Sequence, residues 1–395
     1  MDYNEVLETA RTKIGTKCKA CPICNGVACR NTMPGPGAKG IGDTAIRNYQ
    51  KWQEIRVNMD TICEKKQIDT GLELFGKHFS YPFFAGPVGA IAMHYSNAYS
   101  DVTYNEVLVS ACAENGIAAF TGDGLDSSVM AAATRAIKAV DGQGIPTVKP
   151  WNLETIKEKL ALVKESGAFA VAMDIDAAGL PFLQNMMPPA GSKSVSELAE
   201  IAQQAGVPFI VKGIMTAKAA LKAQQAGAHA IIVSNHGGRV LDQCAATAEV
   251  LPEIAAAVDG KMRIIVDGGI RSGVDIFKAL ALGADAVVIA RPFVTAVFGG
   301  GKEGVKVYIE KLAAESAGGP LYRDLPQYSF TAAGFFLVLL RAAQSAGTAS
   351  EPLPGGYVLP ECSRALYSIP GDRTWLLGGG FCRCAGPGGL RWWRW

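Results

Sequence analysis

The sequence lacks any apolar run long enough to cross a membrane. Its longest, from Ala332 to Leu340, is far shorter than the roughly 20 residues that a membrane-spanning helix needs. It also lacks a basic start followed by an apolar stretch, because Met1 to Lys19 alternates charged and apolar residues. We therefore expect no transmembrane helix, no secretion signal and a cytoplasmic location.

A strong charge of either sign is missing as well. The 38 basic and 36 acidic residues give a formal net charge of +2, which creates no field that would attract a nucleic acid or a membrane surface. A small-molecule partner is expected instead. With 395 residues, 49% of them hydrophobic, the chain can bury a core large enough for one barrel with extensions or for two ordinary domains.

What the sequence does contain is an alternation of short apolar runs and longer helical segments, from Tyr81 to about Glu315. This alternation is typical of βα units around a parallel sheet. Eight runs are predicted as strands: Pro82 to Ala85, Ile117 to Phe120, Thr147 to Lys149, Phe169 to Met173, Pro208 to Val211, Ala230 to Val233, Arg263 to Val266 and Ala286 to Ile289.

Helices are expected between these strands, for example over Leu153 to Glu165 and Ala217 to Gln225, with glycine at several predicted C-caps. Eight βα units in roughly 235 residues match the size of a TIM (β/α)8 barrel. We assign this α/β barrel to residues 81–316. An open doubly wound sheet is the alternative.

The segments that flank the barrel differ from it in composition. Residues 1–80 are interpreted as a Cys-rich extension that caps one face of the barrel. Residues 317–395 form an atypical tail, in which Trp375, Trp392, Trp393 and Trp395 stand among Gly, Pro and isolated Arg without helix or strand period. A change of reading frame near Ala317 is the favoured interpretation, with disorder and an appended interaction segment as alternatives.

Polar residues gather directly after the predicted strands, where a parallel barrel places its active site. Asp267 to Gly273 follows the seventh strand, and Ala290 and Arg291 follow the eighth. The glycines would let backbone N–H groups approach an anion, and the helix near Gly273 adds the positive end of its dipole. Because Arg271 and Arg291 also offer forked donors, these loops are predicted to bind a phosphate group.

The segment SNHGGRVLD, after the sixth strand, holds His236 and Arg239 beside paired glycines. An imidazole takes up a proton near neutral pH and an Arg binds a carboxylate through two hydrogen bonds, so the pair favours a hydroxy or amino acid substrate. A hydrogen-bonded structural histidine is the alternative. Lys212 ends the fifth strand and needs an anionic or electron-rich partner, because a buried ammonium is costly; an ion pair with Asp174 or Asp176 is the structural alternative.

The segments VKGIM, SNHGGRVLD and VDGGIRSGVDIFKALALGADAVVIARP closely resemble the FMN-dependent 2-hydroxy acid oxidases and dehydrogenases, which include glycolate oxidase and lactate oxidase. The resemblance runs from about Tyr81 to Glu315. It implies FMN as the cofactor and oxidation of a small L-2-hydroxy acid to the 2-oxo acid. Oxygen or another electron acceptor would take the electrons, and relatives of this fold often form homo-oligomers.

Carried over by matching motif, the resemblance implies roles for the residues at the strand ends. His236 would be the catalytic base, Asp176 would orient it, and Arg239 would bind the substrate carboxylate. Lys212 matches the lysine beside the N1 and O2 region of the flavin. The other cofactor contacts are expected from Pro87, Val88, Gly89, Thr121, Asp174, Ser234, Asp267, Gly268, Gly269, Arg271, Ala290 and Arg291.

The sequence also departs from the family pattern on the substrate side. Lys149 stands where the family has a substrate-contacting Tyr, and residues 179–183 hold no second substrate Arg. We therefore assign Lys149 to substrate binding and leave room for a substrate other than glycolate or lactate. Two alternatives stay open: an FMN-dependent isomerase or other phosphate-ligand enzyme on the same barrel, and an inactive barrel with a damaged C-terminus.

Four cysteines, Cys18, Cys21, Cys24 and Cys29, fall within twelve residues and are foreign to those oxidases. Without a secretion signal, they favour reduced thiols or metal ligands over disulfides. Closely spaced thiolates hold zinc or an iron-sulfur cluster, and the first two spacings are those of the ferredoxin run, although the third is one residue longer. A metal site and a set of reduced thiols in a Gly-rich loop both remain open.

Overall fold

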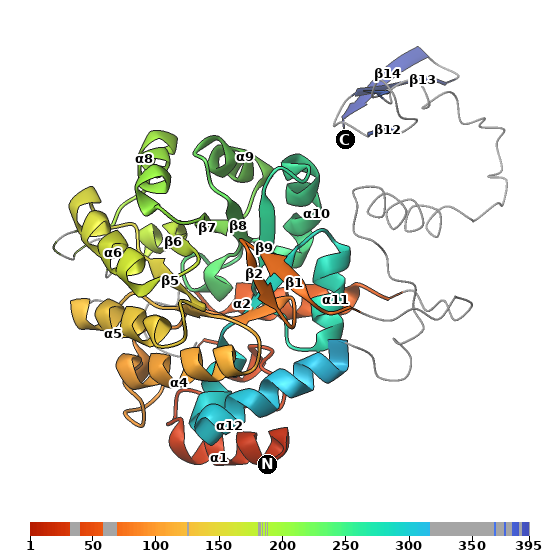
Figure 1. Cartoon of the computed structure of the whole chain (residues 1–395). Helices are drawn as coiled ribbons and strands as arrows, with labels where there is room; N and C mark the ends of the chain where they lie inside the picture. Colours follow the sequence, from red (N-terminus) through yellow and green to blue (C-terminus); the bar gives the residue numbers. More distant parts are fainter. Residues whose placement is uncertain are drawn as a thin grey trace. The chain divides into compact units, whose positions relative to one another are not determined.

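In the computed structural model, the chain forms a closed barrel of parallel strands surrounded by helices (Figure 1). The structure describes residues 1–31, 40–57, 69–124, 126–180, 183, 185, 187 and 189–316, and four short strands beyond residue 366. Around the barrel the strands follow the order β10-β3-β4-β5-β6-β7-β8-β9. Because the last barrel strand pairs with the first, the predicted TIM barrel is confirmed and the open sheet is wrong.

The strands of the barrel agree with the predicted runs in number and order, but several bounds are shifted. They are β3 (Phe83–Ala85), β4 (Ala119–Thr121), β5 (Gly144–Val148), β6 (Val171–Asp174), β7 (Phe209–Ile214), β8 (Ala230–Val233), β9 (Arg263–Val266) and β10 (Ala286–Ile289). Strand β7 continues past its predicted end at Val211 to Ile214, and a register shift between Lys212 and Ile214 keeps it paired with β8. Lys212 therefore lies inside its strand and not beyond its end.

Helices connect the barrel strands, and local sequence explains where they begin and end. Asn152 caps α6 by accepting a hydrogen bond from the Thr155 N–H, and Gly167 ends it with a φ of 70°. The connecting elements are α3 (Ile91–His94), α4 (Asp101–Glu114), α5 (Ser127–Lys138), α6 (Leu153–Ser166), η2 (Ile175–Gly179), α8 (Val195–Ala205), α9 (Ala217–Gln225), η3 (His236–Gly238), α10 (Thr247–Val258), α11 (Gly273–Ala281) and α12 (Arg291–Ser316).

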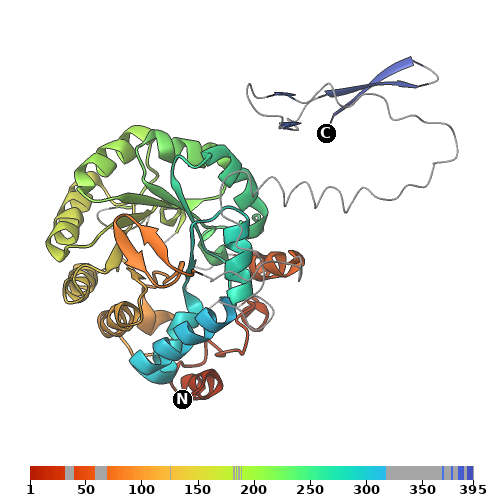
Figure 2. The same cartoon turned by 45° about the vertical axis from the view of Figure 1, so that its right-hand side comes forward.

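A hairpin of β1 (Leu72–Leu74) and β2 (Lys77–Phe79) lies across one end of the barrel (Figure 2). Phe79 is fully buried, and its ring centroid lies 4.9 Å from that of Phe84 and 5.4 Å from that of Phe169. Phe84 in turn packs near Phe120 inside the barrel. The hairpin thus closes the N-terminal ends of the strands with aromatic side chains.

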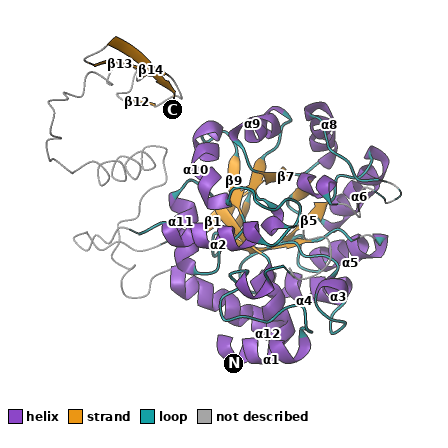
Figure 3. Cartoon of the chain, turned by 180° about the vertical axis from the view of Figure 1, so that it is seen from behind, coloured by secondary structure: helices purple, strands orange, loops and turns teal. Residues whose placement is uncertain are grey.

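Helix α2 (Asp43–Glu54) lies at the opposite end of the barrel (Figure 3). Its Asn48 exchanges two hydrogen bonds, of 2.7 and 2.8 Å, with Asn235, and the Trp52 indole donates to the carbonyl of Gly268 at 2.8 Å. The sequence suggested that residues 1–80 cap one face of the barrel, and this expectation was wrong. The extension contacts both ends, because Phe79 of the hairpin packs at one end and Asn48 and Trp52 of α2 form hydrogen bonds at the other.

The N-terminal helix α1 (Tyr3–Lys13) packs on α12, where Tyr3 and Tyr308 stack with ring centroids 5.1 Å apart. Helix α12 bends at Gly301, whose φ of 58° breaks the helical conformation. The cysteine-containing loop leads from α1 to the short helix η1 (Val27–Cys29). This loop therefore starts from a helix that packs on α12, the last helix of the barrel domain.

Beyond Ser316, the described residues form two antiparallel strand pairs. They are β11 (Tyr367–Ser368) with β12 (Trp375–Leu376), and β13 (Phe381–Gly386) with β14 (Gly389–Arg394). The expectation of no strand in the tail was wrong for these residues, which are rich in the aromatic types that favour strands. The rest of 317–395, including the proposed frame change near Ala317, lies outside the described residues.

None of the described helices combines the length and the apolar character that crossing a bilayer would require.

We predict that Phe79→Ala lowers the free energy of unfolding by about 3–5 kcal/mol, the usual cost of emptying a buried Phe site. Denaturant unfolding measures the change. His78→Ala, in the same strand but with an exposed side chain, should change the stability by less than about 1 kcal/mol. A loss from Phe79→Ala as small as that of the control would mean that the hairpin is not part of the barrel core.

Candidate active site

A cavity of about 620 Å³ lies at the C-terminal ends of the barrel strands. Most of the side chains predicted to act together line it. From the sequence prediction these are Pro87, Val88, Gly89, Lys149, Asp174, Lys212, His236, Arg239, Asp267, Gly268, Gly269, Arg271, Ala290 and Arg291. Thr121, Asp176 and Ser234 are not in the lining; Thr121 and Ser234 are buried at the ends of their strands, and Asp176 lies behind His236.

His236 lies close to two carboxylates, those of Asp176 and Asp174. Its Nδ1 lies 3.2 Å from both Oδ1 and Oδ2 of Asp176 and 3.5 Å from Oδ1 of Asp174. The backbone of His236 has a φ of 56°, a conformation that non-glycine residues seldom adopt. This strained turn directs Nδ1 toward Asp176, so Nε2 lies on the opposite side of the ring from that carboxylate.

Lys212 is buried and its ammonium lies 2.8 Å from Oδ1 of Asp174 and 4.0 Å from Oδ2 of Asp267. The ion pair that the sequence left as a structural alternative is therefore present, although Lys212 lines the cavity too. Burial would lower the pKa of Lys212, but the carboxylates of Asp174, Asp176 and Asp267 raise it. Lys212 thus stays a cation inside the barrel.

The two carboxyl groups near His236 differ in their protonation tendency. Burial would raise the pKa of Asp174, but the charges of His236 and Lys212 bring it well below its ordinary value. Burial raises the pKa of Asp176, and the charges of Lys212 and His236 offset only part of this increase. Asp174 is therefore the firmly ionised member of the pair, as expected for the direct partner of Lys212.

Asp267 directly follows β9 and lines the cavity. Its Oδ2 accepts a hydrogen bond of 2.9 Å from the Ser234 hydroxyl, whereas Oδ1 is buried without a hydrogen-bond partner among the described residues. Burial raises the pKa of Asp267. A buried oxygen without a partner is costly, so this atom is suited to meet a donor from a bound molecule.

Gly268 and Gly269 have φ values of 86° and 84°, and α2 presses against both. A Cβ at Gly269 would lie 2.2 Å from the carbonyl oxygen of Asn48. These glycines are therefore needed for the approach of α2, independently of any anion. Sequence reasoning assigned them to phosphate binding alone, because contacts with a distant helix leave no local signal.

Arg271 is partly engaged by the backbone, since its Nε donates to the carbonyl of Cys24 at 2.7 Å and its Nη1 to that of Ile270 at 2.6 Å. Arg291 begins α12 and lies near Gly237 of the histidine loop. Both arginines line the cavity at neighbouring strand ends. The predicted convergence of two guanidinium groups is thus observed, with Arg271 held by the cysteine-containing loop.

Arg239 contacts His94, with Nη2 lying 3.2 Å from both ring nitrogens. Burial, followed by the charges of Arg239 and Lys17, lowers the pKa of His94 from 6.5 to about 4. His94 is therefore neutral near pH 7 and can lie against a guanidinium. From the sequence alone this histidine was not assigned to the site, because a lone His after a strand is most often a loop residue.

Asp123 was missed by sequence reasoning. It is buried, and its carboxylate accepts hydrogen bonds from the Lys149 backbone N–H at 3.1 Å, the Trp151 indole at 2.7 Å and the Lys159 ammonium at 2.7 Å. These bonds hold the turn after β5 and bring Lys149 to the cavity wall. Only the buried Trp and Lys that follow Lys149 in the sequence could have hinted at such a partner.

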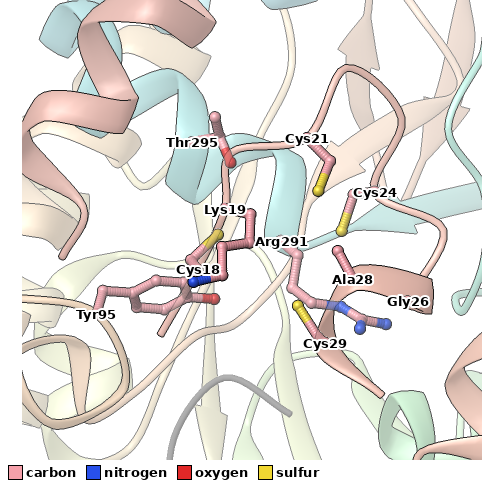
Figure 4. Close-up of a pocket in the computed structure, with 10 residues that line it drawn as sticks. All are labelled: Cys18, Lys19, Cys21, Cys24, Gly26, Ala28, Cys29, Tyr95, Arg291 and Thr295. Carbon is pink, nitrogen blue, oxygen red and sulfur yellow. The ribbon is translucent and has the colours of Figure 1, made fainter. Parts of the chain in front are cut away.

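The four clustered cysteines line a second, smaller pocket next to the cavity (Figure 4). Their thiols are free, and none is paired in a disulfide. Burial opposes ionisation of Cys24, but Arg271 and Arg291 lower its pKa below the ordinary value. Arg291 and Tyr95 line both pockets, so the cysteines lie at the end of the cavity where the two arginines are found.

A family model described as FMN-dependent dehydrogenase matches residues 36–185 and 181–318. The chain belongs to this family. The resemblance noted from the motifs is thereby confirmed, and FMN is the cofactor.

Several curated relatives are similar to segments of this chain. An L-lactate oxidase of Lactobacillus jensenii is 50% identical over 120 residues, which are 30% of this chain and 29% of that enzyme. A 4-hydroxymandelate oxidase of Amycolatopsis orientalis is 28% identical over 333 residues, 73% of this chain and 90% of its own length. In the relatives that are about 50% identical, the matched segment thus covers less than a third of the relative's own length.

Among solved structures, a mandelate oxidase with benzoyl-formic acid superposes with a TM-score of 0.63 and 24% identity. The superposition covers 80% of this chain and 92% of the other. At this identity the likeness shows the barrel fold alone.

The lowered pKa of His94 predicts how stability depends on pH. Between about 6.5 and about 4 the folded chain binds fewer protons at this site than the unfolded chain, so its contribution to the free energy of unfolding falls as the pH falls through that window. We expect His94→Gln to flatten the slope, measured by denaturant unfolding at several pH values. Met93→Leu, an exposed neighbour that does not titrate, should keep the slope; an unchanged slope in His94→Gln would contradict the assignment.

Proposed function

We propose that the chain oxidises a small L-2-hydroxy acid to the 2-oxo acid with FMN. The observation that carries this proposal is the arrangement of His236 and Arg239 on one cavity wall, with Asp176 behind the histidine. An imidazole held by a carboxylate is suited to take a proton, and a guanidinium is suited to hold a carboxylate. A 2-hydroxy acid presents both groups on adjacent carbons.

The cavity suits FMN on observations independent of the family. Its volume falls in the range of cofactor sites, the Oδ1 atom of Asp267 is buried without a partner among the described residues, and Arg271 and Arg291 meet at the strand ends where barrels often bind phosphate. These arginines, with Gly268 and Gly269, would hold the phosphate, and the remaining predicted cofactor contacts would surround the ribityl chain and ring. When bound, FMN accepts the electron pair of the substrate.

On the protein side, Arg239 would hold the substrate carboxylate, with neutral His94 against its guanidinium. His236 would take the proton, and Asp176 would keep the ring oriented and stabilise the imidazolium that results. Lys212 would offset negative charge on the cofactor ring while remaining paired with Asp174. Lys149, placed by Asp123, would contact the substrate where relatives are expected to have a Tyr.

Replacing His236 by Gln tests the proposed base. Flavin reduction by a 2-hydroxy acid, followed by anaerobic stopped-flow absorbance, should slow by about 10²–10⁴-fold because general-base catalysis is lost. FMN content should stay at the wild-type level. His78→Gln, far from the cavity and exposed, serves as the control, and reduction at the wild-type rate in His236→Gln would refute the assignment.

Arg239→Met tests carboxylate binding. Because a bidentate charged hydrogen bond contributes about 3 kcal/mol, kcat/KM should fall by about 100-fold. Arg135→Met, on the exposed surface of α5, should leave both kinetic constants unchanged. If kcat/KM of Arg239→Met stays within a few-fold of the wild type, another cation binds the substrate.

The same measurements separate the alternatives. An isomerase that uses FMN would show no net flavin reduction by a 2-hydroxy acid, and an inactive barrel would show neither reduction nor turnover. The barrel closes between β3 and β10 with residues up to Ser316 only, which favours a competent domain. Four properties stay predictions: the identity of the substrate side chain, the electron acceptor, the formation of a homo-oligomer and the location in the cytoplasm.

A further inference from the structure

The four cysteines belong to one fixed loop on the barrel and not to a free terminus. The loop follows α1 and passes through Ala20, which is buried and has a φ of 41°. Arg271 donates to the carbonyl of Cys24 at 2.7 Å, and the Lys17 ammonium donates to the carbonyl of Met93. A loop attached to two strand-end segments at several points has a defined shape, which a multidentate metal site requires.

All four thiols face one small pocket. Figure 4 shows the sulfur atoms of Cys18, Cys21, Cys24 and Cys29 around the side chain of Arg291, with Tyr95 at one side. The four are partly buried, and the other two described cysteines lie elsewhere: Cys112 is in α4 and Cys244 is near Thr44. Four reduced thiols of one short loop therefore line the same pocket, as the spacing alone did not establish.

The separation of the sulfurs favours one of the two kinds of metal site that the motif left open. A zinc ion with four ligands at about 2.3 Å in a tetrahedron would hold its sulfurs about 3.8 Å apart. Among the described residues, only Asp174, Asp176 and His236 bring three ligand atoms within 4.8 Å of one another. No three of the four cysteine sulfurs lie this close together. A four-iron cluster binds each thiolate at a different iron and so would hold the sulfurs farther apart than a single ion does.

The charges around the pocket suit such a cluster. Four thiolates with a cluster carry a net negative charge, which is costly near a protein interior without compensation. Lys19 and Arg291 line the pocket, and Arg271 is bonded to the loop at Cys24. The nearby acidic groups of the active site, Asp174 and Asp267, face Lys212. Arg271 and Arg291 would thus lie between the thiolates and the FMN phosphate, and Lys19 adds a cation on the cysteine side.

We propose that Cys18, Cys21, Cys24 and Cys29 bind a four-iron iron-sulfur cluster beside the cofactor cavity. Arg291 and Tyr95 line both sites, so the cluster adjoins the part of the cavity assigned to the FMN phosphate. Resting on the proposed function, the cluster is the electron outlet of the enzyme. Oxidation of one CH–OH group to C=O releases two electrons and two protons. The electron pair would pass to FMN and leave through the cluster in two single-electron steps to an external one-electron carrier. The two protons, of which His236 would take one, would be released to water.

The test begins with the full-length protein purified under anaerobic conditions and, in parallel, reconstituted with ferrous iron and sulfide. We expect about four irons and four acid-labile sulfides per chain, and an electron paramagnetic resonance signal after reduction with dithionite. Cys21→Ser and Cys24→Ser should lose this signal and most of the iron while retaining FMN. Cys244→Ser, a partly buried cysteine outside the loop, should retain both.

Three results would overturn the cluster: about one zinc and no sulfide per chain, no iron after reconstitution, or full iron content in both loop variants. FMN content and the far-UV circular dichroism spectrum show whether a variant has folded. If both loop variants fail to fold, the metal and sulfide content of the wild-type chain decides.

A second arm separates the cluster from the proposed oxidation. The wild-type chain is mixed anaerobically with a 2-hydroxy acid and its resonance spectrum is recorded. A reduced cluster supports the electron outlet. Reduced FMN with an oxidised cluster overturns the outlet and leaves the metal site. If dithionite reduces the cluster but the hydroxy acid reduces neither group, the proposed oxidation fails and the cluster stands.

Discussion

The ammonium of Lys212 is buried where the strands of the barrel converge, and it requires anionic partners in this low-dielectric position. Asp174 from β6 and Asp267 from the end of β9 supply them, and the same carboxylates reach His236 and Ser234. The positions of His236 and of the aspartates beside it thus depend on one buried charge. Such an arrangement forms only when the barrel closes, since its members come from strands that lie far apart in the sequence.

The N-terminal extension connects features that a barrel alone would leave separate. Its hairpin closes one end with Phe79, its α2 helix supports the glycines after β9 through Asn48, and its cysteine-containing loop holds Arg271. Changes in this extension would therefore reach the cofactor cavity through direct contacts. The cysteines gain their position beside Arg291 in the same way.

Much of the site could be predicted because strand ends carry a strong local signal. Lys212, His236, Arg239 and Asp267 each follow or end an apolar run, and all four line the cavity. Asp123 and His94 were undervalued, because their roles come from partners such as Lys159 and Arg239 that no spacing reveals. Bounds were also less accurate than order, as the bulge that takes β7 to Ile214 shows.

By itself, the sequence determined the barrel and the family, and it indicated the residues that are proposed to carry the chemistry, since periodicity and short motifs are local properties of the chain. Only the tertiary structure decided that residues 1–80 contact both ends of the barrel and that Lys212 pairs with Asp174. It also placed four cysteines and two arginines at neighbouring pockets. These are contacts between segments up to about 250 residues apart, and such contacts arise from closure of the barrel and packing of the extension.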